Sequence, residues 1–198
     1  MSSDIQPLNS IGPMGQAGNP EKNDDPVQAE YEEGKRYLEN SNLGQAAVML
    51  HNALVGFEEK KDENGIANAS NQLGHVCLAK EDYVTALTHY QRAFAICDKA
   101  NDRMSVLAVL DKVAVAQKGL KKYDDAISTC LDILDQYQDN RDPQGAVSTL
   151  EKMAQIYLEK NDKHKAADTY RTIASIHRNF RHENIAADFV KKAEELDN

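Results

Sequence analysis

The sequence contains no tryptophan, and aromatic residues make up only 6% of its 198 positions. It has three cysteines, Cys77, Cys97 and Cys130, which form no C-x-x-C pair, and an odd number cannot all pair within one chain. A fold held together by disulfides is therefore not expected. The cysteines are predicted to be small core residues in a reducing compartment.

The sequence also lacks an excess of positive charge and long apolar runs. Lys and Arg number 23 against 32 Asp and Glu, which gives a formal net charge of −9. A negative chain repels polyanions, so nucleic acid is not an expected partner. The N-terminus has neither the basic start nor the apolar run of a secretory signal. We therefore expect a cytoplasmic protein with no membrane partner.

Motifs of catalysis and metal binding are missing as well. No H-E-x-x-H, G-x-S-x-G, Walker or dinucleotide-binding pattern occurs. The six histidines are scattered, and their sequence spacing selects no metal. The sequence predicts that the protein is not an enzyme and has no cofactor and no metal site.

Proline and glycine are concentrated at the start of the chain. Residues 1–26 hold four of the five prolines and three of the ten glycines, with few large apolar side chains. Such a segment buries too little apolar surface to offset the entropy of ordering, so residues 1–26 are predicted to be a disordered N-terminal tail. The alternative is a docking peptide that uses Ile5, Leu8, Ile11 and Met14.

From residue 27 onward the sequence repeats with a period of 40. Alanine recurs at Ala46, Ala86, Ala126 and Ala166, and further columns at offsets of 4, 7, 8 and 11 are mostly apolar or small. These offsets fall on one face of an α-helix with 3.6 residues per turn. Each repeat is therefore predicted to end in an amphipathic helix.

The first half of each repeat also recurs and is predicted to form a second helix, separated by a short polar turn. Residues 27–198 are expected to form one repeat domain, with repeats at about 27–62, 63–102, 103–142 and 143–182 and a cap helix at 183–198. In that cap helix, Ile185, Phe189, Val190 and Ala193 are expected to cover the preceding helices. The predicted helices pair 27–40 with 43–60, 63–80 with 83–100, 103–119 with 123–138, and 143–160 with 163–180.

These columns resemble tetratricopeptide (TPR) repeats. The second repeat carries Leu73-Gly74, Ala86, Tyr90 and Ala93 at the family spacing, and the first repeat carries Gly34, Tyr37, Ala46 and Ala53. A period of 40 is similar to the long-repeat type of this family. The resemblance implies an all-α fold, a right-handed superhelical α-solenoid of about four TPR-type helix hairpins plus a C-terminal capping helix.

The resemblance further implies a non-enzymatic adaptor or scaffold that binds a partner peptide or helix in a concave groove. A self-assembling structural protein and a peptide-sensing regulator remain alternatives, so a homo-oligomer is possible. The family's inward positions fall on the first helix of each pair. They give the predicted partner-binding groove: Tyr31, Lys35, Leu38, Asn68, Asn71, His75, Leu78, Asp111, Val115, Lys118, Glu151, Gln155 and Leu158.

One branch of the family holds chaperone C-termini with a clamp of Lys, Asn, Asn, Lys and Arg. The matching positions here are Tyr31, Lys35, Gln72, Ala108 and Lys112. The clamp is therefore absent, and chaperone tails are not the expected partner. Because the groove offers both acidic and basic side chains, the charge of the partner stays open.

Overall fold

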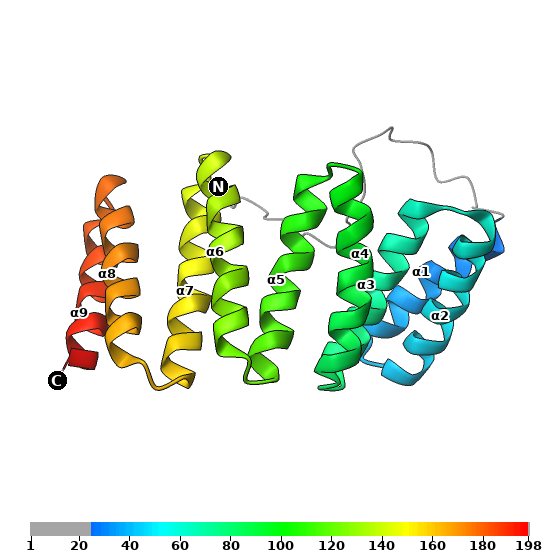
Figure 1. Ribbon diagram of the computed structural model, residues 1–198, viewed down its shortest axis with the longest axis horizontal. Coiled ribbons are helices and arrows are strands. Elements are labelled where there is room, and N and C mark those ends of the chain that lie inside the picture. Colours follow the sequence, from blue (N-terminus) through cyan, green and yellow to red (C-terminus); the bar gives the residue numbers. More distant parts are fainter. Residues whose placement is uncertain (1–24, 198) are drawn as a thin grey trace. The chain divides into compact units, whose positions relative to one another are not determined.

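The computed structural model describes residues 25–197, and within that range α-helices are joined by short turns, with no strand. The predicted tail lies outside the described residues except for Asp25, which caps the first helix, and Pro26, which begins it. Figure 1 labels the helices found between residues 25 and 197: α1 (Pro26–Glu39), α2 (Leu43–Lys60), α3 (Glu63–Ala79), α4 (Tyr83–Lys99), α5 (Arg103–Gly119), α6 (Tyr123–Asp139), α7 (Pro143–Glu159), α8 (Lys163–Asn179) and α9 (Glu183–Asp197).

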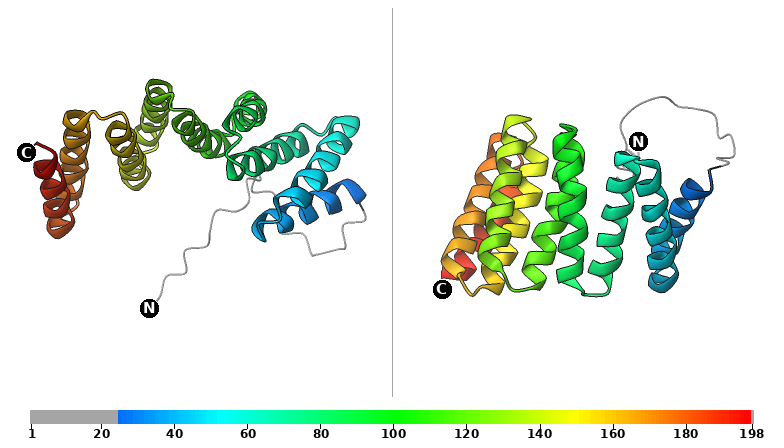
Figure 2. Two further views of the ribbon diagram at one scale, coloured as in Figure 1. Left: turned by 90° about the horizontal axis from the view of Figure 1, so that it is seen from below. Right: turned by 45° about the vertical axis from the view of Figure 1, so that its right-hand side comes forward.

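The helices agree with the sequence prediction to within one residue at each end. Successive helices pack against each other, α1 on α2 and α3 on α4 in the first half, and α7 on α8 and α8 on α9 in the second. The antiparallel runs can be followed in both views of Figure 2. The predicted helix hairpins are therefore confirmed.

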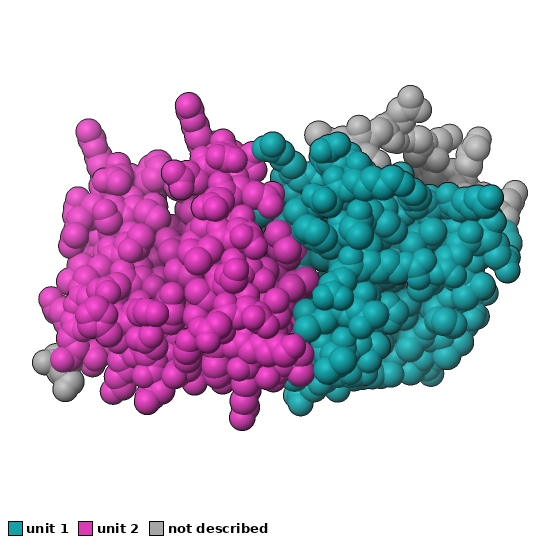
Figure 3. All heavy atoms as spheres, viewed as in Figure 1, with its two compact units in different colours: residues 1–109 teal, residues 110–198 magenta. Residues whose placement is uncertain are grey.

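The chain divides into two compact units, which Figure 3 shows in different colours. Unit 1 ends at Val109 and unit 2 begins at Leu110, so the boundary falls within α5. Each unit has its own apolar core.

The turns between the helices follow one pattern. A residue in the left-handed backbone region recurs every 20 positions among the described residues, at Ser41, Lys61, Glu81, Asn101, Lys121, Arg141, Asn161 and Arg181. At Glu81, for example, φ is 59°, and the next N–H, that of Asp82, donates to the Cys77 carbonyl at 2.9 Å. Asp82 then accepts a hydrogen bond from the Thr85 N–H and caps α4. Such a turn satisfies the open backbone groups of two helix ends at once.

The core of unit 1 depends on close approach between paired helices. Gly34 and Gly74 lie where a Cβ atom would come within 2.7 Å of Leu50 and 2.5 Å of the Tyr90 ring, respectively. Leu50 and Tyr90 are themselves fully buried. Glycine at these two positions is therefore what allows a large side chain to fill the space between the helices.

In unit 2 the core lies between α6, α7, α8 and α9, and it includes Cys130, Ile156, Ile173 and Phe189. Cys97 and Cys130 are both buried, as predicted for small core residues, whereas Cys77 is only half-buried. Burial raises the pKa of the Cys130 thiol to about 11, so it is protonated and unreactive at neutral pH.

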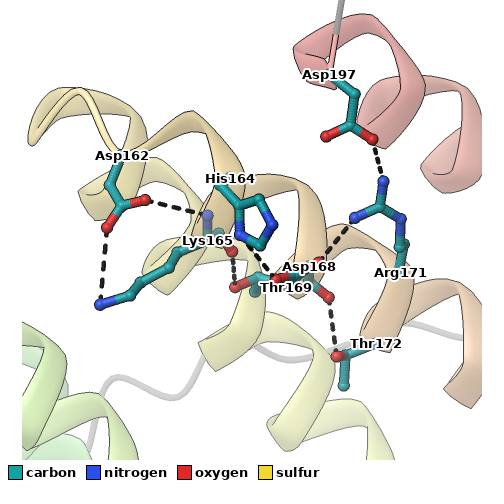
Figure 4. A network of polar contacts seen from close by, with 8 residues as sticks. All are labelled: Asp162, His164, Lys165, Asp168, Thr169, Arg171, Thr172 and Asp197. Atoms are coloured by element: carbon teal, nitrogen blue, oxygen red, sulfur yellow. Dashed lines mark hydrogen bonds and ion pairs between the residues drawn. The ribbon is translucent and has the colours of Figure 1, made fainter.

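The cap helix α9 covers α8 with a slightly different face from the one predicted. Phe189 and Ala193 are buried as expected, but Ile185 is 45% exposed and Ala186 takes its place in the core. The prediction for Ile185 was wrong because the buried face of α9 follows positions 186, 189 and 193, which are three or four residues apart, and Ile185 lies at the edge of that face. Figure 4 shows how Arg171 on α8 pairs with Asp168 on its own helix and with Asp197 near the end of α9.

Candidate functional site

The predicted groove residues lie on the first helix of each pair. In unit 1 they come from α1 and α3, which contact each other, and in unit 2 from α5 and α7. Their exposure differs widely. Tyr31 and Asn71 are buried, Glu151 and Gln155 are exposed, and the other nine are half-buried. We refer to all thirteen as the first-helix residues.

On α1, Tyr31 is a packing residue with a basic neighbour. Its ring meets the Phe57 ring edge-on, with 6.0 Å between centroids, and the Lys35 ammonium lies 5.2 Å from the Tyr31 centroid. Lys35 also forms an ion pair with Glu32 at 3.0 Å. Burial raises the pKa of Tyr31 to about 12, so its phenol stays neutral over the physiological range.

A chain of polar contacts joins α3 to α4. The Asn71 Nδ2 atom lies 3.3 Å from His75 Nε2, and His75 Nδ1 lies 3.4 Å from the Tyr90 hydroxyl. If Asn71 donates to Nε2, the neutral imidazole must carry its proton on Nδ1 and donate to Tyr90. The His75 and Tyr90 rings also meet edge-on at 5.7 Å. His75 is thus held in one orientation.

Asn71 has an unusual environment within this chain. The residue is only 4% exposed, and its carbonyl oxygen Oδ1 is buried without a hydrogen-bond partner. An acceptor left in this state costs roughly 1–3 kcal/mol. A donor brought to this point, with a small movement of the side chain, would recover that free energy.

In unit 2 the charged first-helix residues pair across neighbouring first helices. Asp111 on α5 forms an ion pair with Lys152 on α7, and it lies 3.3 Å from Lys112. Lys118 on α5 pairs with Glu159 on α7 at 3.0 Å. The charges that could meet a partner are therefore already partly neutralised within the protein.

Of the remaining first-helix residues, Leu38 packs against the unit 1 core. Val115 and Leu158 are half-buried in unit 2, and Asn68 and Leu78 are half-buried on α3. They supply apolar and amide surface beside the polar groups described above.

Unit 2 also contains a hollow that the sequence analysis missed. It has a volume of about 510 Å³ and lies between the C-terminal turns of α6 and α8 and the first turns of α7. Its lining is mainly apolar: Leu134, Tyr137, Gln138, Arg141, Asp142, Pro143, Ala146, Leu150, Thr172, Ile176 and Phe180. The available signal was Phe180, which is 53% exposed and stands where the other repeats have Lys60, Ala100 and Asn140.

Within the described range, no three His, Cys, Asp or Glu side chains come together as a group that could hold a metal ion. None of the helices between residues 25 and 197 is long and apolar enough to cross a membrane.

These observations define the class of protein: an array of antiparallel helix hairpins whose paired helices meet through Gly and Ala and leave polar side chains on the first helices. Comparison with family models identifies the family. Tetratricopeptide repeat models match residues 65–139 and 141–179, and the chain belongs to the tetratricopeptide repeat proteins. Repeats of this family generally bind proteins and are usually not catalytic.

Solved structures agree with this assignment of the fold. A putative kinesin light chain from Podosopora anserina with nearly identical TPR-like repeats is 13% identical, with a TM-score of 0.71 and coverage of 86% of both chains. The apo form of RapI is 13% identical, with a TM-score of 0.69, over 85% of this chain and 62% of that one.

A Rap protein in complex with Competence and Sporulation Factor is 12% identical, with a TM-score of 0.62, over 87% of this chain and 64% of that one. Comparison with curated proteins gives no match. At these identities the structures establish a shared fold, and they leave the partner of this chain to be inferred from its own residues.

Proposed function

We propose that the protein is a non-enzymatic adaptor of the cytoplasm that binds a peptide or helix of a partner protein along its first-helix residues. The observation that carries this proposal is the Asn71–His75–Tyr90 chain, in which the Asn71 Oδ1 atom has no partner. A peptide backbone presents N–H donors at regular intervals, so it is a suitable guest for an oriented side-chain amide.

The ion pairs narrow the character of the partner. Lys35, Asp111 and Lys118 are each bound to an opposite charge of the protein itself. A strongly charged guest would have to displace these contacts, whereas a guest held by backbone hydrogen bonds and apolar contacts would not. We therefore expect the affinity to depend only weakly on salt.

A peptide-sensing regulator is the second candidate. It is favoured by the similarity to the Rap structures, one of which was solved in complex with Competence and Sporulation Factor and another with the Phr* peptide. On this hypothesis the guest is a short free peptide, and not a segment of a larger protein.

The test is affinity capture from the source cell with the full chain as bait. The variant carries Asn71→Ala and His75→Ala. The chain itself offers a matched control, His51→Ala with Asn52→Ala, which removes the same two residue types from exposed positions on the second helix α2. Circular dichroism checks that both variants keep the helicity of the native chain.

Capture of a partner by the native chain and the control, and its loss with the Asn71 and His75 variant, would support the proposal. Equal capture by all three would refute the role of the first-helix residues. Recovery of further copies of the bait alone would favour self-assembly instead, and light scattering at micromolar concentration would verify it.

A further inference from the structure

The turn between α8 and α9 differs from its counterparts in two side chains. At the same two positions the earlier repeats have Phe57 and Asp62, Cys97 and Asp102, or Tyr137 and Asp142; here they are His177 and His182. The three aspartates cap the next helix, accepting from the N–H groups of Gly65, Ser105 and Gly145. The last turn thus has a histidine both where a core residue and where a capping residue is expected.

The backbone of this turn holds the two histidines in a defined relation. The His182 N–H donates to the His177 carbonyl at 2.9 Å, and the Arg181 N–H donates to the Arg178 carbonyl at 2.9 Å. Arg181 has a φ of 60°, as at the other turns. Residues five apart are therefore brought together across the turn, which a search for helical ligand spacing does not detect.

The side chains are also held. The His177 ring stacks on Phe189 of α9, with 5.7 Å between centroids and 9° between planes. The His182 ring stacks on Phe180 at 6.3 Å. The two Nδ1 atoms face each other at 3.4 Å. His177 is half-buried and His182 is exposed, so the space between the nitrogens is reachable from solvent.

The 3.4 Å between the nitrogens is within reach of a long hydrogen bond, as between His75 and Tyr90, and it also equals the spacing of two nitrogen ligands on one metal ion. An N–H donor normally approaches its acceptor to about 2.7–3.2 Å. Two nitrogens bound to one tetrahedral zinc ion at about 2.0–2.1 Å lie about 3.3–3.4 Å apart. The geometry points to a two-histidine site for a divalent ion of the zinc class, with both Nδ1 atoms as ligands and water in the remaining positions.

The experiment is calorimetric titration of the full chain with zinc chloride at neutral pH. Long-range ¹H–¹⁵N spectra of the imidazoles then report which ring nitrogens bind. Two variants remove one ligand each and use residues that the chain has at equivalent turns: His177→Phe, matching Phe57, and His182→Asn, matching Asn42. The controls are His51→Gln and His164→Gln, since His164 lies beside Asp168 in a separate pair.

We expect one zinc ion per chain, shifts at Nδ1 of His177 and His182, and a loss of affinity of at least about tenfold in either ligand variant. Both controls should bind as the native chain does. If a ligand variant loses helicity, His177→Gln or His182→Gln replaces it. No binding by the native chain, unchanged binding in both ligand variants, or loss of binding in a control would overturn the proposal.

Discussion

Replacement of Gly74 by alanine tests whether the core of unit 1 depends on the close approach of α3 and α4. The added methyl group would lie 2.5 and 2.7 Å from two carbons of the Tyr90 ring, and Tyr90 is 0% exposed. Gly44, on α2, is the matched control, because a Cβ atom there meets nothing within 4 Å.

Both substitutions gain helix propensity, and only Gly74→Ala also overpacks the core. Alanine is better than glycine in a helix by roughly 0.5–1 kcal/mol, so Gly44→Ala should raise the free energy of unfolding by up to that amount. Overpacking of a filled core costs about 1–3 kcal/mol. Gly74→Ala should therefore lower the free energy of unfolding by about 1–2 kcal/mol.

The repeats themselves supply an internal comparison. Ala114 occupies the Gly74 position in the third repeat, and the residue across from it is the smaller Cys130. In the fourth repeat Ala154 stands opposite Tyr170, which is half-buried, whereas Tyr90 is fully buried. A Cβ atom is thus found only where the facing side chain is small or lies further out.

Urea unfolding followed by circular dichroism would measure the free energy of unfolding of the native chain, of Gly74→Ala and of Gly44→Ala. The Gly74→Ala substitution would also be measured in a chain that carries Tyr90→Cys. With the smaller side chain opposite, Gly74→Ala should no longer be destabilising. The reasoning is refuted if Gly74→Ala stabilises the native chain as Gly44→Ala does, or if its cost is the same on both backgrounds.

Three further predictions concern a helix cap, a turn and a buried phenol. Asp142→Ala removes the acceptor for the Gly145 N–H and should lower the free energy of unfolding by about 1 kcal/mol in urea; no change would argue against the cap. Glu81→Gly relieves a φ of 59° and should raise the same quantity by about 1 kcal/mol, so a loss would contradict the strain argument. The pKa of Tyr31 is raised from 10.0 to about 12, so its contribution to stability should be complete below pH 10 and be lost as the pH rises to about 12. Absorbance titration of native and Tyr31→Phe chains measures it, and ionisation of Tyr31 near pH 10 would refute it.

The helices could be predicted to within a residue because their ends depend on local signals. A polar turn recurs at a fixed step, with an Asp cap at several of the turns such as Asp62 and Asp142, and the apolar columns fix which face is buried. The close helix pairing was also readable, since Gly34 and Gly74 occupy the positions where the family has small residues. Local sequence is sufficient for features that involve one helix and its neighbour in the same repeat.

The details of the site could not be predicted in this way. The contact between Lys118 and Glu159 joins residues 41 positions apart, and it depends on how α5 packs beside α7. Asn71 was expected in the groove, yet it is only 4% exposed, so a guest reaches its Oδ1 atom only when the side chain moves. The hollow around Phe180 arises from the sizes of side chains on three helices, which no single column of the repeat records.

The turns have a consequence for how such a chain can change in length. Since the described turns recur every 20 residues with the same backbone conformation, the junction within a hairpin is interchangeable with the junction between hairpins. A segment of 40 residues could be added or removed at any of them without new turn chemistry. A segment of 20 residues, which is one helix with its turn, could be joined by the same turns. Every later helix would then change from first to second in its hairpin, or the reverse. Duplication in whole hairpins therefore keeps these polar side chains on first helices, whereas duplication by one helix would place them on second helices in all that follows.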